Sequence, residues 1–189
     1  MLSKNHPVAD KYKEWTYDLV RKDVQNNTFP YAVLMQNLSY DINIGSFIRN
    51  GNAFGAEKIF YVQDKKKFNP TGAVGSHHYK EIKYIKYLEG LSEVKELKEE
   101  YYFVMFDTGI GAIPLDRYCW HDMDKRNRKP LLVFGCEGTG LTEDMIQLAD
   151  VKLEIKMFGS VRSLNTAVAA GIAMNSVATY FNGLRKYER

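Results

Sequence analysis

Short, unbroken apolar runs alternate with longer amphipathic segments along most of the chain. Such runs are typical of strands buried on both faces of a parallel sheet. The amphipathic segments have the spacing of helices that cover a sheet on one side. The pattern therefore predicts an α/β fold, a parallel sheet with helices on both faces. Strands are predicted at residues 31–35, 58–62, 84–85, 101–106, 130–134 and 151–155, and helices at residues 10–25, 44–54, 92–100, 142–149 and 163–184.

Small polar residues stand where three of the predicted helices begin. Their side chains can accept hydrogen bonds from the free backbone N–H groups of the first helical turn. The expected N-caps are Asp41 or Asn43, Thr142 and Ser163. The polar stretch at residues 63–78 is predicted to be a long surface loop. No repeat or linker divides the chain, so we expect a single domain over residues 1–189, with an N-terminal helical extension at about residues 1–28.

The composition is that of a globular protein, with 45% hydrophobic and 26% charged residues. The net charge of +3 permits a polyanionic partner without requiring one. No apolar run approaches the roughly 18 residues of a membrane span, and the N-terminus lacks the apolar core of a signal peptide. Cys119 and Cys136 lie far apart, and His77 and His78 have no third ligand nearby. We therefore expect a cytoplasmic protein with reduced thiols, no metal and no membrane contact.

The first candidate motif covers residues 43–50, at the start of a predicted helix. Gly45 lies one turn before Arg49, away from the apolar stripe, so the surface beside the guanidinium is expected to be bare. An arginine so placed suits a phosphate, which it can bind through two parallel hydrogen bonds. Taken alone, the segment favours an ordinary surface arginine on an amphipathic helix.

The second motif, residues 134–141, follows an apolar strand and contains Gly135, Gly138 and Gly140. Glycines allow tight turns and a close approach of the backbone to a ligand, and parallel sheets bind ligands at the carboxyl ends of their strands. Glu137 stands where the dinucleotide fingerprint requires glycine, and the lysine of a P-loop is absent. Taken alone, the loop is a weak signal.

The third motif, residues 155–165, runs from a strand through a loop into the last helix. With Ser163 as its cap, the helix would direct backbone N–H groups toward the same end of the sheet as the second motif. Taken alone, this segment fits a capped helix in a packed core. Taken together, the three motifs place polar groups at the carboxyl side of predicted strands, which favours a ligand site there.

The ordered set of motifs resembles the SpoU, or TrmH, family of RNA 2′-O-ribose methyltransferases, in the SPOUT superfamily. The similarity extends over roughly residues 31–180. The matching patterns are Asn43-x-Gly45-x-x-x-Arg49, Gly135-x-Glu137-Gly138-x-Gly140-Leu141 and Ile155-x-Met157-x-Gly159-x-x-x-Ser163-Leu164-Asn165. Lys156 departs from the family, which usually has proline there.

The resemblance implies a C-terminal deep trefoil knot, a homodimer whose active sites take residues from both subunits, and S-adenosylmethionine as the methyl donor. It implies transfer of the methyl group to a ribose 2′-hydroxyl of tRNA or rRNA, with Arg49 in the central catalytic role. The other implied catalytic positions are Asn43, Glu137, Ser163 and Asn165, and the implied cofactor positions are Gly135, Ile155, Met157 and Leu164. Phe106 and Asp107, at the end of another predicted strand, are further candidates for the cofactor pocket.

Two other functions compete with this one. A catalytically silent RNA-binding homologue is disfavoured because the motif residues are intact, and a dehydrogenase is disfavoured because GxGxxG is missing. RNA binding requires a positive surface, although any single basic cluster also fits a solvated charged face. The candidate clusters are residues 65–67, residues 125–129, Arg185 with Lys186, and Lys11, Lys13, Arg21 and Lys22 on the first helix.

Overall fold

The computed structural model of the protein describes residues 8–36, 40–63, 69–87, 91–123 and 127–187. A seven-stranded sheet runs through this part of the chain, and all of its strand pairs are parallel, in the order β3-β2-β1-β6-β4-β7-β5. The strands are β1 (Phe29–Gln36), β2 (Ala56–Val62), β3 (Ile82–Ile85), β4 (Tyr101–Phe106), β5 (Ile113–Pro114), β6 (Lys129–Phe134) and β7 (Val151–Glu154). The predicted parallel sheet is therefore confirmed.

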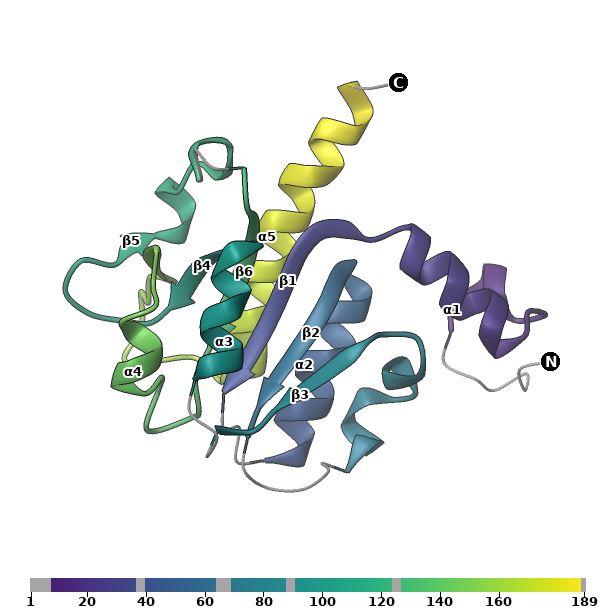
Figure 1. Cartoon of the computed structure of the whole chain (residues 1–189), viewed down its shortest axis with the longest axis horizontal. Coiled ribbons are helices and arrows are strands. Elements are labelled where there is room, and N and C mark those ends of the chain that lie inside the picture. Colours follow the sequence, from purple (N-terminus) through teal and green to yellow (C-terminus); the bar gives the residue numbers. More distant parts are fainter. Residues whose placement is uncertain (1–7, 37–39, 64–68, 88–90, 124–126, 188–189) are drawn as a thin grey trace.

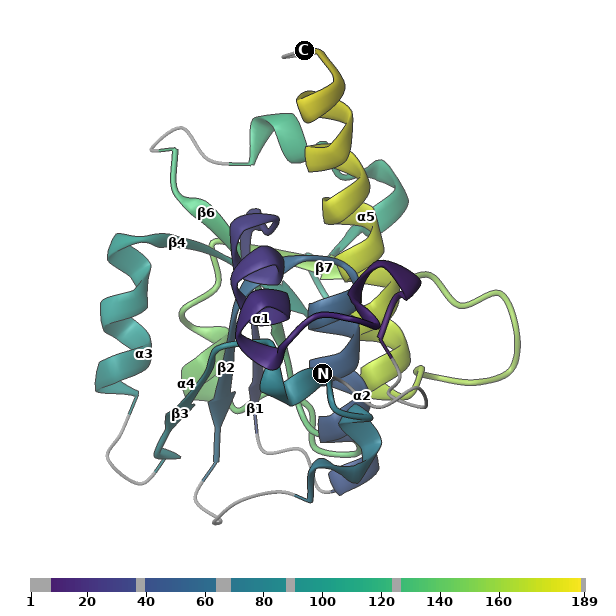
Figure 2. The same ribbon diagram turned by 90° about the vertical axis from the view of Figure 1, so that its right-hand side faces the viewer.

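Helices cover both faces of the sheet, as predicted (Figures 1 and 2). The long helices α2 (Asp41–Ala53) and α5 (Thr166–Tyr187) lie on one face, and the short helices α3 (Ser92–Glu96) and α4 (Glu143–Ile146) lie on the other. Among the described helices, none is both long and apolar enough to cross a membrane. The deep trefoil knot implied by the family resemblance stays a prediction.

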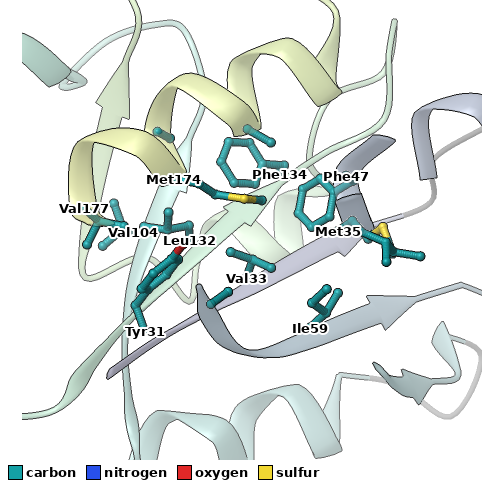
Figure 3. Packing of buried hydrophobic residues seen from close by; sticks show 14 of the residues in the cluster. Tyr31, Val33, Met35, Phe47, Ile59, Val104, Leu132, Phe134, Met174 and Val177 are labelled. Atoms are coloured by element: carbon teal, nitrogen blue, oxygen red, sulfur yellow. The ribbon is translucent and has the colours of Figure 1, made fainter. Parts of the chain in front are cut away.

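The central strands β1, β6 and β4 are mostly apolar because both of their faces are buried. Alternate residues of β1 point to opposite faces, where they enter two separate clusters of buried side chains. Figure 3 shows the cluster formed with α2 and α5. That cluster contains Tyr31, Val33 and Met35 of β1 with Phe47 and Met174, whereas the other contains Ala32 and Leu34 with Val94 and Met145.

The N-terminal helix is shorter than predicted. Residues 10–25 were expected to form one helix, but the chain makes a single 3₁₀ turn at Asp10–Tyr12 and then begins α1 at Tyr17–Asn26. The break follows from Thr16, which has extended backbone angles and whose hydroxyl accepts a hydrogen bond from the Leu19 N–H. Val20 of α1 packs against Tyr79, which attaches the helix to the segment before β3.

The predicted caps were largely wrong. Tyr40, and neither Asp41 nor Asn43, precedes α2. Thr142 precedes α4 as expected, but its hydroxyl accepts a hydrogen bond from the buried Gln36 amide at 2.9 Å and caps no N–H group.

The last helix begins at Thr166, three residues after the predicted cap. The Asn165 Oδ1 atom accepts hydrogen bonds from the N–H groups of Ala167 and Val168, at 3.0 and 3.3 Å. Asn165 therefore caps α5, and Ser163 lies exposed in the loop before it. Serine and asparagine are about equally good caps, so the sequence alone did not separate them.

Short elements were missed. The segment predicted as a surface loop contains 3₁₀ turns at Pro70–Ala73 and Ser76–His78, and the first of these packs against α2. Strand β5 has only two residues, too few to produce a hydrophobic period. Further 3₁₀ turns lie at Leu97–Glu99, Leu115–Arg117 and Trp120–Asp122.

Candidate active site

A pocket of about 430 Å³ lies at the edge of the sheet where β4, β6 and β7 end. Because these strands are parallel, the loops that follow them meet at this edge. The volume is within the range of small-molecule sites. The residues that line the pocket are Phe106, Asp107, Thr108, residues 134–140, Leu153, Ile155, Met157, Arg162, Ser163, Leu164, Thr166 and Ala169.

All six residues predicted to bind the cofactor line this one pocket. Phe106 is the last residue of β4 and Asp107 follows it, Gly135 follows β6, and Ile155, Met157 and Leu164 lie between β7 and α5. The Phe106 and Phe134 rings, neighbours in the β4–β6 register, stack at 4.8 Å. The pocket therefore offers an aromatic and aliphatic surface next to polar backbone groups. Lys156, the departure from the family pattern, points into solvent and is not among the lining residues.

The glycine-bearing loop after β6 folds back on itself in a tight turn. The backbone N–H groups of Cys136 and Gly140 donate to each other's carbonyl oxygens, at 3.1 and 2.9 Å. A Cβ atom on Gly135 would lie 2.2 Å from the Gly140 carbonyl carbon, which is too close for any side chain to be added there without moving the backbone. Gly138 and Gly140 have φ angles of 94° and 70°, in the left-handed region. The turn thus depends on its glycines.

A chain of hydrogen bonds connects the three sequence motifs. The Asn43 side-chain amide donates to Glu137 Oε1, and the Asn165 amide donates to Asn43 Oδ1 at 3.1 Å. Asn165 in turn caps α5. Asn43, Glu137 and Asn165, which are separated by up to 122 residues in sequence, therefore form one polar group.

The second carboxylate oxygen of Glu137 is free to accept a hydrogen bond. Glu137 Oε2 is buried and has no hydrogen-bond partner in the described part of the chain. A buried acceptor without a donor is destabilising. Glu137 can therefore receive a donor that the described part of the chain does not provide, and its place in the pocket wall puts that donor at the ligand site.

Two of the predicted catalytic residues lie apart from this polar group. Ser163 lines the pocket but is exposed, and no hydrogen bond of its side chain is found in the described region. Arg49 is exposed on α2 and is not among the residues that line the pocket of its own chain. The bare surface expected beside it at Gly45 does not exist, because the backbone of Gly72 and Ala73 packs there, within 2.4 to 2.5 Å of where a Cβ atom would be.

Sequence reasoning missed several residues that hold the loops in place. The Thr166 hydroxyl donates to the Gly135 carbonyl oxygen at 2.9 Å and so connects the second and third motifs. Gln36 is fully buried at the end of β1, where its Oε1 accepts from the Thr142 N–H at 3.1 Å. A glutamine directly after an apolar strand was a usable signal, because buried polar side chains are nearly always paired.

Most of the described residues in the candidate basic clusters form ion pairs or hydrogen bonds within the chain. Lys129 contacts Glu57 and Glu100, each at 3.1 Å, and Arg128 contacts Asp150 at 3.3 Å. Arg185 donates to the Thr28 carbonyl oxygen. Lys11 and Lys13 form ion pairs with Asp23 and Asp10. Residues 65–67, 125 and 126 lie outside the described residues, and Arg21, Lys22 and Lys186 remain candidates.

Comparison with known protein families shows to which family this chain belongs. The SpoU rRNA Methylase family matches residues 30–175, which include all three motifs and the whole pocket. The chain belongs to the SpoU rRNA Methylase family. The family resemblance inferred from the sequence is thus confirmed.

This SpoU family protein is similar to several curated relatives. A putative TrmH family tRNA/rRNA methyltransferase of Bacillus subtilis is 28% identical over 85% of the chain, and the match covers 63% of that relative, so the chain spans less than two thirds of its length. The tRNA (guanosine(18)-2′-O)-methyltransferase of Thermus thermophilus is 29% identical over 76% of the chain and 71% of its own length. The 23S rRNA (guanosine-2′-O-)-methyltransferase of Acinetobacter baylyi is 24% identical over 80% of the chain and 60% of its length.

Solved structures share the fold of this SpoU family protein. The TrmH/SpoU tRNA modifying enzyme of A. aeolicus has a TM-score of 0.76 at 21% identity, and the match covers 92% of this chain and 86% of that one. The SpoU methyltransferase AviRb of Streptomyces viridochromogenes, solved with AdoMet, has a TM-score of 0.66 at 23% identity, over 79% of this chain and 57% of that one.

Proposed function

We propose that the protein is an S-adenosylmethionine-dependent 2′-O-ribose methyltransferase that acts on tRNA or rRNA. The observation that carries the proposal is that the Glu137–Asn43–Asn165 group adjoins a pocket lined by the two loops of the family motifs. The relatives are named as methyltransferases of both RNA classes, so the proposal covers both.

The pocket fits the methyl donor. Phe106, Ile155 and Leu164 offer apolar contacts to an adenine ring, and the backbone of the Gly135 turn offers hydrogen bonds without a side chain in the way. Asp107 lies in the pocket wall, where a carboxylate is suited to ribose hydroxyls. S-adenosylmethionine supplies, when bound, a methyl group already activated on a sulfonium sulfur.

The chain's own residues must hold the ribose in line and stabilise the charge that develops on its oxygen. The transfer would break the sulfur–methyl bond and form a carbon–oxygen bond, and the hydroxyl proton would pass to water or to another basic group. Orientation of two reactants can contribute about 7–11 kcal/mol to lowering the barrier. The free Oε2 atom of Glu137 can accept a hydrogen bond from the RNA or from an arginine, and Asn43 fixes the carboxylate in place.

We further propose that Arg49 acts in the pocket of a second copy of the chain, within a homodimer. Arg49 lies on the exposed side of α2, outside the pocket of its own subunit. A hollow of about 570 Å³ between α2 and α5 is lined by Asn165 together with Val168 and Ile172, which are 51% and 41% exposed. Exposed apolar residues beside a site that needs a further donor favour a symmetric contact at this face. Arginine stays protonated, so its role is to orient the RNA phosphate and hydroxyl and to stabilise negative charge.

Ser163 is proposed to contact the RNA or the donor directly, because it lines the pocket and is exposed. We also propose that residues 1–189 form one domain, since the strands from Phe29 to Glu154 share one sheet. A cytoplasmic location is proposed because Cys119 and Cys136 do not form a disulfide bond.

The proposed activity is tested by incubating the protein with radiolabelled S-adenosylmethionine and RNA from cells that lack the gene. After nuclease digestion, we expect the label in 2′-O-methylated nucleosides of tRNA or rRNA. Label in a nucleobase, or none in any RNA, would contradict the proposal. RNA binding without incorporation would identify a silent homologue.

A pair of variants at Asn165 separates its two contacts. Asn165→Ala removes the cap of α5 and is expected to lower the free energy of unfolding by about 1 kcal/mol. Asn165→Asp keeps an oxygen that caps the helix, so its stability is expected to stay near that of the wild type. It replaces the amide that donates to Asn43, so the methyl-transfer rate is expected to fall by about tenfold or more.

Urea denaturation and single-turnover methyl transfer measure these two effects. Equal activity of Asn165→Asp and the wild type would exclude the contact with Asn43 from the function of the site.

A further inference from the structure

A second cavity, of about 410 Å³, lies at the opposite edge of the sheet from the cofactor pocket. Its walls come from the segments that lead into β1, β2 and β3, together with α5, whereas the cofactor pocket lies where strands end. The lining residues include Tyr12, Phe29, Asn52, Phe54, Lys80 and Thr179. No sequence motif pointed to this place.

Lys80 is a buried cation in the wall of this cavity. The residue is 4% exposed, and its Nζ atom donates to the Ala56 carbonyl oxygen at 2.6 Å. Among the described residues, no carboxylate forms an ion pair with Lys80; Glu57, which interacts with it electrostatically, is bound to Lys129 and Tyr101. Burial lowers the pKa of the Lys80 ammonium to about 8. An ammonium has three donors, so two remain for a ligand.

Asn52 provides a further donor without a partner. Its Nδ2 atom is buried and makes no hydrogen bond to any described residue. None of the residues that line the cavity is a carboxylate. The cavity thus presents a buried positive charge and a free amide N–H, and leaving both unsatisfied is destabilising. A ligand with several anionic oxygens would satisfy both.

Three aromatic side chains also line the cavity, those of Tyr12, Phe29 and Phe54, among small and uncharged polar residues. The guanidinium of Arg185 lies 4.3 Å from the centre of the Phe29 ring, so a second cation lies beside one of these rings. Aromatic side chains beside a cationic group are the combination that proteins use to bind a base and its phosphate. The volume is sufficient for a small ligand.

We propose that this cavity is a second site, which binds a nucleotide with its phosphate at Lys80 and Asn52 and its base against the aromatic side chains. The phosphate chemistry is the same whether the ligand is a free mononucleotide or one nucleotide of an RNA. The proposal does not depend on methyl transfer, and its test measures binding.

The site is tested by isothermal titration calorimetry with 5′-AMP, inorganic phosphate and adenosine, each in the presence of saturating S-adenosylhomocysteine to fill the other pocket. We expect AMP to bind at one site per chain, and adenosine to bind at least about tenfold more weakly. Lys80→Met is expected to weaken AMP binding by about tenfold or more, because a charge-assisted contact is lost.

Lys80→Met also removes the hydrogen bond to the Ala56 carbonyl oxygen and could therefore lose binding through misfolding. A second variant controls for this. Thr179→Trp places a large side chain in the cavity from the exposed side of α5 and leaves Lys80 intact. Leu184→Trp, on the same helix and outside the cavity, is the matched control and is expected to bind AMP like the wild type.

Three outcomes would overturn the proposal: no saturable AMP binding, AMP binding undiminished in both Lys80→Met and Thr179→Trp, or adenosine binding as tightly as AMP. If the site exists, addition of folded tRNA identifies its source of phosphate. Displacement of AMP assigns the site to RNA, and simultaneous binding assigns it to a free mononucleotide.

Discussion

Replacement of Arg49 by alanine is expected to lower the rate of methyl transfer by about 10²- to 10⁴-fold and to leave the affinity for S-adenosylmethionine unchanged. Arg49 is exposed and does not line the cofactor pocket of its own chain, so its loss affects neither the fold nor that pocket. Single-turnover methyl transfer with labelled donor measures the first quantity, and calorimetric titration of the donor measures the second. Arg49→Lys keeps the charge but not the two parallel hydrogen bonds, so we expect only partial rescue.

A mixing experiment tests whether Arg49 acts across a dimer. Arg49→Ala is combined with a variant that cannot bind the donor, such as Gly135→Ala, and the subunits are allowed to exchange. If Arg49 serves the partner's pocket, each mixed dimer has one intact site, and about a quarter of the wild-type activity returns. If it serves its own subunit, no site is intact, and the lack of any recovered activity would refute the dimeric arrangement.

Replacement of Gly135 by alanine is expected to weaken the binding of S-adenosylmethionine by at least about 100-fold. The added Cβ atom would lie 2.2 Å from the Gly140 carbonyl carbon and 2.3 Å from the Leu141 nitrogen, so the turn that forms one wall of the pocket must open. Displacements of about 1 Å in a site can change rates and affinities by this factor. Calorimetric titration of the donor provides the measurement.

Gly159→Ala is the matched control for this prediction. Gly159 lies in the third motif, yet a Cβ atom there would meet no heavy atom within 4 Å. The affinity of Gly159→Ala for S-adenosylmethionine is therefore expected to stay within about twofold of that of the wild type, with an unchanged thermal unfolding midpoint. Equal losses in the two variants would show that glycine is needed in these loops for a reason other than the close contact at Gly135.

The strands and the pocket were predictable because their signals are local. A strand buried on both faces is mostly apolar, as residues 31–35 of β1 and 130–134 of β6 are, and ligand loops follow the carboxyl ends of such strands. The helix start at Thr16 and the cap at Asn165 were missed because several neighbouring residues could cap equally well.

Contacts between residues that are distant in sequence could not be predicted from the sequence pattern. Nothing local indicates that Asn43 donates to Glu137 or that Gly45 contacts Gly72, since both depend on how distant segments pack. The cavity around Lys80 lies at the edge where strands begin, and the sequence offered no motif there. The isolated lysine between Tyr79 and Glu81 resembles an ordinary surface residue until its burial is known.

The bond between Asn165 and Asn43 has a consequence for how the protein is made. During synthesis, α2 leaves the ribosome long before Asn165, the residue that donates to Asn43 of α2 and caps α5. A nascent or prematurely terminated chain that ends before residue 165 carries Arg49 yet lacks this partner of Asn43, the Thr166 bond to Gly135 and one wall of the donor pocket. Unfinished copies of the protein therefore lack part of the candidate active site.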